Sequence, residues 1–209
     1  MNINNYHVDD FGVIHQKKIY PITYDKKYVK ERYDTYGEKV RQMSFLRLGY
    51  LLGAINKTPK SILDVGYGNG DFLKTCASII PECFGNDVTG YPLPENIKFI
   101  ENIFENYYEV ISFFDVLEHF ENINIIQHLK CDYIIISVPW CYDYENKEWF
   151  LNWKHLRPNE HLHHFNEKSL IKFFEHNSFQ CVCYSNVEDA IRKDPNNKKN
   201  ILTAVFKKI

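Results

Sequence analysis

Three glycines in one short segment give the strongest chemical signal in this chain. Gly66, Gly68 and Gly70 alternate with other residues directly after the apolar run Ser61 to Val65. Glycine lets the backbone take positive φ, and it lets a ligand approach without a Cβ in the way. A helix that starts directly after such a turn points free backbone N–H groups at a ligand. The pattern therefore predicts a strand, a tight turn and a helix that bind a nucleotide-like cofactor.

Two acids beside this turn separate the candidate cofactors. A dinucleotide fingerprint requires the spacing G-x-G-x-x-G, whereas here Asp71 stands where the third glycine would be, and Asp64 precedes the first glycine. A pyrophosphate gains nothing from two nearby carboxylates. A cofactor that carries an ammonium and a sulfonium, and no phosphate, tolerates them. S-adenosylmethionine is such a cofactor.

A third acid, Asp87, follows the next predicted strand, residues 82–86, roughly twenty residues after the turn. A carboxylate at this place can accept hydrogen bonds from both hydroxyl groups of a ribose, as in the dinucleotide folds. We expect Asp87 to bind the ribose. The alternative is an aspartate that caps its own loop.

The elements that must position these residues are indicated by apolar periodicity. Apolar residues at three- and four-residue steps predict helices at 37–55, 72–80 and 169–176. Short apolar runs predict further strands at 97–100, 110–114, 133–138, 179–184 and 201–206. Alternating strands and helices predict an α/β fold, with a parallel sheet and helices on both faces. The last two strands fit an antiparallel hairpin at the edge.

Size and charge limit the class of protein. A chain of 209 residues that is 44% hydrophobic is long enough for one well-packed domain. Its net charge of −2 gives no global basic field, so we expect no nucleic-acid partner. No apolar run approaches the roughly 20 residues of a membrane span, and the first residues do not resemble a secretory signal. We therefore expect a cytoplasmic protein.

The six cysteines of the chain contain no C-x-x-C pair. Cys181 and Cys183 have the two-residue spacing of one face of a strand. These cysteines favour buried free thiols over a zinc site or disulfides.

Three motifs in order give the chain a family resemblance. They are Leu46-Arg-Leu-Gly-Tyr50 before the first strand of the predicted sheet, Asp64-Val-Gly-Tyr-Gly-Asn-Gly70 after it, and Asp115-Val-Leu-Glu-His119 after the fourth. From about residue 37 to the end, the chain resembles the class I S-adenosylmethionine-dependent methyltransferases. It is most similar to the small-molecule branch that includes the ubiquinone-biosynthesis O-methyltransferases. This resemblance implies a Rossmann-like, doubly wound sheet of seven strands.

The resemblance also divides the chain and assigns residues. Residues 37–209 would form the methyltransferase domain, and residues 1–36, which match nothing, would wrap or cap the site. The implied contacts with S-adenosylmethionine come from Arg47, Asp64, Gly66, Tyr67, Gly68, Gly70, Asp87, Val88, Asn102, Ile103, Asp115 and Val116.

Among these implied contacts, Arg47 would hold the methionine carboxylate through a charge-assisted fork, and Asp64 would face the ammonium. Asn102 and Ile103 would contact the adenine. The alternatives are a solvated helix arginine at Arg47 and an ordinary turn at Asn102 and Ile103.

The motif after the fourth strand allows two interpretations. If a helical turn starts at Asp115, then Asp115, Glu118 and His119 share one face. In the quinone enzymes the corresponding residues can hold a divalent metal, and two carboxylates with an imidazole suit such an ion. In many relatives the same residues line the cofactor pocket without a metal. We expect pocket lining and no metal, with the metal site as the alternative.

Four histidines, His155, His161, His163 and His164, follow the fifth strand together with three tryptophans. Ligands of open α/β sheets bind beyond the carboxyl ends of the strands, so this segment can form an acceptor pocket. Histidine is the side chain most easily tuned to take a proton near neutral pH. We select His119 and His161 as candidate catalytic residues. The alternative is a loop packed over the sheet edge, with histidines bound to backbone.

The sequence thus predicts methyl transfer to an oxygen, or less readily a nitrogen, of a small acceptor such as a sugar, phenol or quinone precursor. S-adenosylhomocysteine would be the product. The rival hypotheses are a nucleic-acid methyltransferase, a nicotinamide-dependent oxidoreductase and a protein that binds S-adenosylmethionine without catalysis. No feature of the sequence indicates the oligomeric state.

Overall fold

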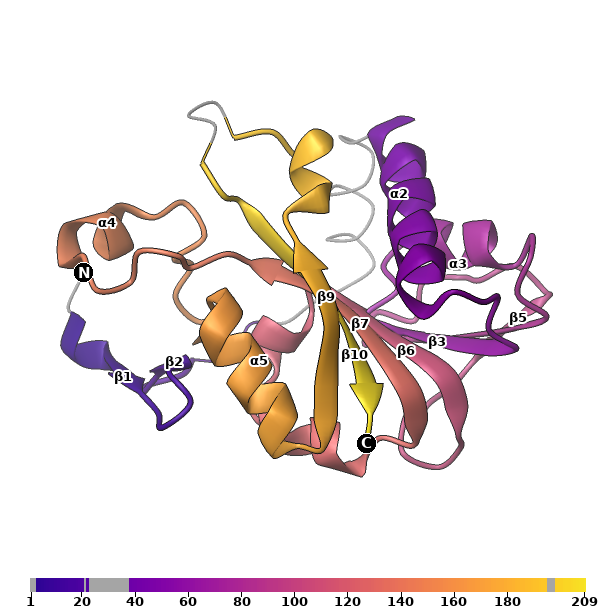
Figure 1. Ribbon diagram of the computed structural model, residues 1–209, viewed down its shortest axis with the longest axis horizontal. Helices are drawn as coiled ribbons and strands as arrows, with labels where there is room; N and C mark the ends of the chain where they lie inside the picture. Colours follow the sequence, from indigo (N-terminus) through magenta and orange to yellow (C-terminus); the bar gives the residue numbers. More distant parts are fainter. Residues whose placement is uncertain (1–2, 21, 23–37, 195–197) are drawn as a thin grey trace.

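The computed structural model describes residues 3–20, 22, 38–194 and 198–209. Its main sheet has seven strands (Figure 1), in the order β5 (Ile97–Phe99), β4 (Glu82–Asn86), β3 (Ser61–Val65), β6 (Tyr108–Phe114), β7 (Cys131–Pro139), β10 (Ile201–Lys208) and β9 (Phe179–Ser185). Strand β10 is antiparallel to both of its neighbours, and the pairs from β5 to β7 are parallel. The predicted α/β sheet is confirmed. The closing hairpin is also present, although β10 lies inside the sheet and β9 forms the edge.

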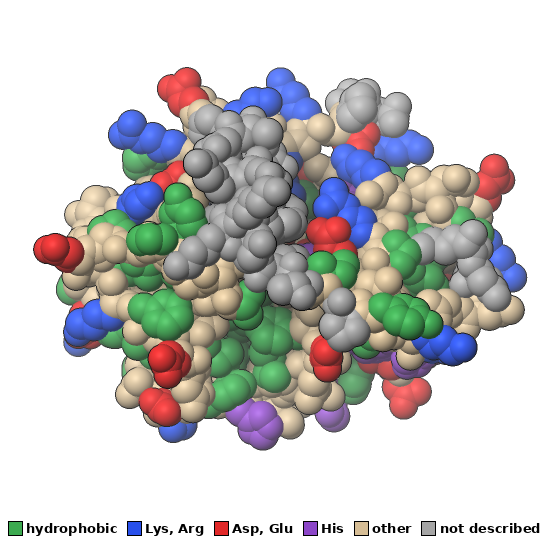
Figure 2. Space-filling model, turned by 180° about the vertical axis from the view of Figure 1, so that it is seen from behind, with side chains coloured by type: hydrophobic (Ala, Val, Ile, Leu, Met, Phe, Trp, Pro, Cys, Tyr) green, Lys and Arg blue, Asp and Glu red, His purple; other side chains and the backbone are tan. Residues whose placement is uncertain are grey.

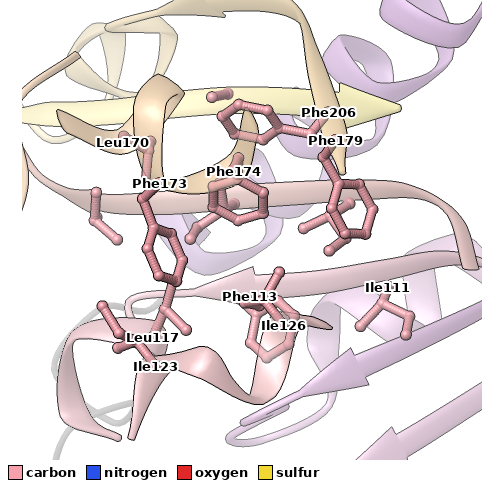
Figure 3. Packing of buried hydrophobic residues seen from close by; sticks show 14 of the residues in the cluster. Ile111, Phe113, Leu117, Ile123, Ile126, Leu170, Phe173, Phe174, Phe179 and Phe206 are labelled. Atoms are coloured by element: carbon pink, nitrogen blue, oxygen red, sulfur yellow. The ribbon is translucent and has the colours of Figure 1, made fainter. Parts of the chain in front are cut away.

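Each face of the sheet carries its own core, because side chains of a strand alternate between the two faces. On β6, Ile111 and Phe113 pack with helix α5 (Glu167–His176), as Figure 3 shows. Val110 of the same strand packs on the other face, with helices α2 (Glu38–Ile55) and α3 (Asp71–Cys76). Helices therefore cover both faces, as predicted.

Aromatic stacking fixes α5 to the sheet. Phe174 of α5 lies parallel to Phe206 of β10, with ring centroids 4.0 Å apart and both side chains fully buried. At its start, α5 has a capping box in which Asn166 and Ser169 exchange side-chain and backbone hydrogen bonds. The helix is thus held by its cap and by one apolar face.

The connections between the parallel strands contain fewer helices than the alternating pattern predicts. No α-helix lies between β4 and β5 or between β5 and β6, where every residue is described. Only the short 3-10 helices η2 (Leu117–His119) and η3 (Ile123–His128) connect β6 to β7. The predicted helix at 72–80 ends at Cys76, and the chain then turns before Pro81.

A second, small sheet lies beside α5 and α4 (Lys147–Asn152). It joins β1 (Tyr6–Val8) and β2 (Ile14–Gln16) from the N-terminal segment to β8 (His163–His164). The chain enters β1 through the short η1 (Ile3–Asn5), and η4 (Val187–Ala190) follows β9. The described part of the N-terminal segment therefore contacts the segment after β7. Residues 23–37 lie outside the described part, so the division at residue 36 stays a prediction.

All six cysteines are free thiols, four of them buried. Burial raises the pKa of the Cys131 thiol to about 12 and that of Cys83 to about 11. Among the described residues, no helix is both long and apolar enough to cross a bilayer.

Candidate functional site

The glycine turn after β3 has the conformation that its sequence predicts. Gly66, Gly68 and Gly70 all have positive φ, at 73°, 58° and 77°. At Gly66 a Cβ would lie 2.3 Å from Cγ2 of Val116, so a larger residue cannot fit without moving the segment after β6. The turn therefore brings the ends of β3 and β6 into close contact, and Val116 lies against the turn.

Asp87 ties this turn to the end of β4. Its Oδ2 accepts a hydrogen bond from the Gly68 amide at 2.9 Å, and its Oδ1 accepts from the amide and the hydroxyl of Thr89 at 2.8 and 2.6 Å. The loop-capping alternative describes these contacts. Oδ1 already accepts two hydrogen bonds and Oδ2 accepts one, so Oδ2 keeps a lone pair for a ribose hydroxyl, and the ribose contact stays a prediction. The neighbouring Val88 is 84% exposed.

Asp64 is a buried carboxyl under the turn, with only 3% of its surface exposed. It accepts a hydrogen bond from the Ser112 hydroxyl at 2.7 Å. Burial raises the pKa of Asp64 to about 7, against the opposing effects of the Ser112 hydrogen bond and the charge of Arg47. A cation placed nearby would favour the ionised form. Asp64 is thus poised to gain its charge when a cationic ligand binds.

Tyr67 lies in the turn but turns its side chain into the protein. The hydroxyl donates to the carbonyl of Tyr91 at 2.5 Å, and the residue is 4% exposed. Burial raises the pKa of this phenol to about 12, so the hydroxyl keeps its proton. The backbone of Tyr67 is therefore the part of the residue left to face a cofactor.

The residues assigned to the adenine follow β5. The side-chain oxygen of Asn102 accepts from the amide of Phe104 at 3.0 Å, and its amide donates to Glu105 at 3.1 Å. Ile103 is 7% exposed and belongs to the core on the α5 side. The ordinary-turn alternative accounts for these contacts, and the adenine role stays a prediction.

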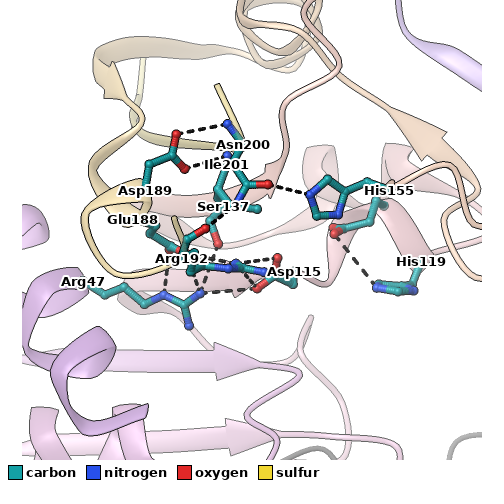
Figure 4. Close-up of polar contacts among 11 residues, drawn as sticks. Arg47, Asp115, His119, Ser137, His155, Glu188, Asp189, Arg192, Asn200 and Ile201 are labelled. Atoms are coloured by element: carbon teal, nitrogen blue, oxygen red, sulfur yellow. Dashed lines mark hydrogen bonds and ion pairs between the residues drawn. The ribbon is translucent and has the colours of Figure 1, made fainter. Parts of the chain in front are cut away.

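Four charged side chains form a cluster where α2, β6 and η4 meet (Figure 4), with Glu188 buried and the other three partly buried. Arg47 of α2 binds Glu188 in bidentate fashion, with Nε to Oε1 at 2.7 Å and Nη2 to Oε2 at 3.0 Å. Arg192 donates from Nη1 to both oxygens of Asp115, at 2.9 and 2.8 Å, and to Glu188 at 3.0 Å. Arg47 Nη2 is also 3.4 Å from Asp115 Oδ2. Two guanidinium groups thus neutralise two carboxylates.

Electrostatics keep this cluster charged. Burial alone would lower the pKa of Arg192, but the charges of Asp115 and Glu188 raise it above its ordinary value. Glu188 has no exposed surface. Asp115 is held with φ at 56°, a conformation that costs energy outside glycine. The cluster therefore fixes Asp115 in a strained conformation at the end of β6.

Sequence reasoning missed Glu188 and Arg192. Their i,i+4 spacing is the one usable signal, but it falls in a segment without apolar periodicity. Arg47, predicted to hold a carboxylate, holds that of Glu188. Within the described part of the chain its Nη1 makes no hydrogen bond, so the predicted contact with the methionine carboxylate remains open to that nitrogen.

The two candidate catalytic histidines lie together. The rings of His119 and His161 meet edge to face, with centroids 4.9 Å apart. Glu118, His119 and His161 each offer a ligand atom within 4.8 Å of the others. The predicted trio contained Asp115 in place of His161. Because Asp115 precedes η2 in a left-handed conformation and points to Arg192, the shared helical face does not form.

Burial sets the protonation of His161. Its pKa is lowered to about 3, chiefly by burial and then by the proximity of His119. The neutral ring places its proton on Nδ1, 2.8 Å from the carbonyl oxygen of His155, and Nε2 is left as an acceptor. The neutral ring can therefore accept a hydrogen bond from a ligand or bind a cation through Nε2. The surrounding segment also fits the loop-packing alternative, since His161 and His163 both contact backbone carbonyl oxygens.

A family model described as a methyltransferase domain, Methyltransf_23, matches residues 32–184. The chain belongs to this family. It is an S-adenosylmethionine-dependent methyltransferase. No curated protein matches the sequence.

Solved structures share the fold of this methyltransferase at low sequence identity. One is the 1,6-didemethyltoxoflavin-N1-methyltransferase of Burkholderia thailandensis with bound S-adenosylhomocysteine. Its sequence is 14% identical and the TM-score is 0.60, and the alignment covers 98% of this chain and 99% of that protein. The magnesium protoporphyrin IX methyltransferase of Synechocystis PCC 6803 is 14% identical with a TM-score of 0.59, covering 82% and 84%. The methyltransferase domain of bacterial CtHen1-C is 16% identical with a TM-score of 0.56, covering 81% and 98%.

The residues around the turn fit S-adenosylmethionine chemically. Asp64 and Asp87 offer carboxylate oxygens at the ends of adjacent strands, beside the glycine turn in which Gly66 packs closely against Val116. Carboxylates suit the ammonium and ribose hydroxyl groups of this cofactor and would repel a pyrophosphate. The expected cofactor therefore agrees with the chemistry of the site.

Replacing Glu188 tests the charge cluster. Glu188→Gln leaves two buried guanidinium groups opposite a single carboxylate, so the free energy of unfolding should fall by about 3–5 kcal/mol. Urea denaturation measures this change. Glu175→Gln, an exposed position on α5, is the control and should leave stability unchanged. Equal midpoints for both variants would show that the cluster contributes nothing specific.

Asp64 gives the protein without cofactor a defined pH dependence. The raised pKa means that the buried carboxyl stabilises the fold while protonated, and this contribution is lost as pH rises from 3.8 to about 7. Asp64→Asn should match wild-type stability at the acidic end and exceed it above neutrality. Urea denaturation across this range is the measurement, with the exposed Asp10→Asn as control. Parallel pH profiles for wild type and Asp64→Asn would refute the buried-acid account.

Proposed function

We propose that this methyltransferase transfers the methyl group to an oxygen of a small acceptor, with a nitrogen as the less favoured target. The sugar, phenol and quinone-precursor classes fit, since each carries a hydroxyl group that must lose a proton. The observation that carries the proposal is the neutral imidazole of His161 beside His119, beyond the carboxyl ends of β6 and β7.

In this mechanism the acceptor oxygen attacks the methyl carbon as the carbon–sulfur bond breaks, and S-adenosylhomocysteine leaves. The hydroxyl proton passes to Nε2 of His161 or to His119. Alignment and exclusion of water supply most of the catalysis, because the sulfonium is already activated. The residues of the donor site then have binding roles, with Asp64 at the ammonium, Asp87 at the ribose and Arg47 Nη1 at the carboxylate.

The N-terminal segment would close the acceptor side. Supporting this role, β2 pairs with β8, and His163 of β8 is two residues from His161. A strand pair attached there can exclude water from the acceptor, while the main sheet binds the donor. The acceptor pocket and the donor pocket would thus be built from different parts of the chain.

Surface charge favours a small acceptor over a nucleic acid. Acidic and basic side chains are interspersed over the face in Figure 2, and the described residues there form no broad basic patch. A nucleic-acid substrate would require such a patch and would make binding strongly salt-dependent. A small molecule makes neither demand.

Asp87→Ala tests the donor site. Loss of the ribose contacts should weaken S-adenosylhomocysteine binding by about 1.5–3 kcal/mol, measured by calorimetry. Glu95→Ala, at an exposed position outside the turn, is the control. Unchanged affinity in Asp87→Ala would remove the ribose assignment, and absence of binding to wild type would remove the donor site itself.

His161→Gln and His119→Gln test the acceptor side. With an acceptor found by screening hydroxylated sugars, phenols and quinone precursors, removal of the general base should reduce turnover by about 10²–10⁴-fold. S-adenosylhomocysteine affinity should stay unchanged. His128→Gln, exposed on η3, is the matched control.

A chelator distinguishes the two roles of this histidine pair. Turnover that survives chelation supports proton transfer. Turnover that is lost with chelator and restored by a divalent cation would show that Glu118, His119 and His161 hold a metal, and the base role would then be wrong.

A further inference from the structure

Two histidine rings join the N-terminal strand pair to the edge of the candidate site. His15 of β2 and His163 of β8 are register partners, and their Nδ1 atoms lie 2.7 Å apart. On the far side of each ring, Nε2 of His15 lies 3.0 Å from Oδ2 of Asp9, and Nε2 of His163 lies 2.7 Å from the carbonyl oxygen of Phe120. The four residues thus form one continuous chain of polar contacts.

The contacts from Asp9 to Phe120 need one hydrogen more than two neutral histidine rings can supply. A carbonyl oxygen only accepts, so Nε2 of His163 must carry a hydrogen. Asp9 Oδ1 accepts from the amides of Phe11 and Val13 at 2.9 and 2.8 Å, and a carboxylate only accepts, so Nε2 of His15 must also donate to Oδ2. Two neutral rings would then face each other with two lone pairs. A hydrogen bond between the Nδ1 atoms needs one further proton.

The surroundings decide which ring carries that proton. His163 contacts the carbonyl oxygen of Phe120, which carries no negative charge. His15 instead contacts the Asp9 carboxylate. The other titratable groups around His15 are His7, whose ring stacks on it at 5.0 Å, and the buried His164. Neither of these supplies a negative charge that would move the proton away from the Asp9 side.

We propose that His15 is an imidazolium and a positioning residue for the acceptor side, donating to Asp9 and His163 and thereby fixing the Phe120 carbonyl. The segment so fixed carries His119. The residue on the other side of His119 is also held, because the amide of Leu162 donates to the carbonyl of Glu118 at 2.7 Å. His119 is therefore clamped between two contacts from the β8 segment, and His15 controls one of them. The catalytic consequence rests on the proposed function, whereas the protonation of His15 does not.

Nitrogen NMR of the histidine side chains tests the protonation directly. In full-length wild-type protein near neutral pH, both ring nitrogens of His15 should show protonated shifts, and His163 should be protonated on Nε2 alone. His15→Asn identifies the signals by their loss. A His15 ring with a single protonated nitrogen would overturn the proposal.

Two substitutions at residue 15 separate positioning from packing. Asparagine places an amide nitrogen near the position of Nδ1 and can donate to His163, whereas glutamine places its amide nitrogen near Nε2 and can donate only toward Asp9. Amide exchange of residues 117–120 should rise by about tenfold in His15→Gln and stay within about twofold of wild type in His15→Asn.

Thermal unfolding and S-adenosylhomocysteine affinity check that both variants fold, with His128→Asn as the surface control. Equal exchange rates in the glutamine and asparagine variants would overturn the positioning role. Failure of wild type to bind S-adenosylhomocysteine would instead contradict the proposed function, and the NMR result would still decide the protonation of His15.

Discussion

The buried pairing of Glu188 with Arg47 and Arg192 is the constraint on which the carboxyl edge of the sheet depends. A carboxylate with no exposed surface is tolerated only when fully paired, since isolated burial costs several kcal/mol per ion. The pairing joins α2, η4 and, through Asp115, the end of β6. Because Asp115 is fixed there, the following segment must turn away from the arginines. That turn carries Glu118 and His119 toward His161.

This arrangement separates the candidate donor site from the proposed acceptor site. On one side, the turn after β3 and the end of β4 present Asp64 and Asp87, which suit a cationic cofactor with hydroxyl groups. On the other side, His119 after β6 and His161 after β7 form the proposed acceptor side, where the neutral ring of His161 would face a hydroxyl. The raised pKa of Asp64 and the lowered pKa of His161 both arise from burial. Burial thus keeps His161 neutral, and it leaves Asp64 able to ionise when a cation binds.

The sequence allowed the sheet to be predicted because its strands are short, continuous apolar runs bounded by turn residues. The strand Glu82–Asn86 was predicted with its observed bounds, and α2 ends at Ile55 as predicted. The missing crossover helices were not predictable from strand alternation alone. A segment between parallel strands can cross in an extended form when other elements, here η3 and α5, cover the face.

The site was predictable only where its residues carry local motifs. The glycine turn is such a motif, and its conformation follows from residues adjacent in sequence. Glu188 and Arg192 are distant from every motif and act through contacts set by the tertiary fold. His161 was selected from the sequence, but its approach to His119 depends on the long-range hydrogen bond between Leu162 and Glu118. Long-range pairing of this kind leaves no periodic signal.

The most direct test of the central claim is an experimental structure with bound S-adenosylhomocysteine. We expect the homocysteine carboxylate to lie at Arg47 and the ribose at Asp87. The sulfur should point across Asp115 toward His119 and His161. Ligand density away from the glycine turn, or a sulfur directed away from the two histidines, would contradict it.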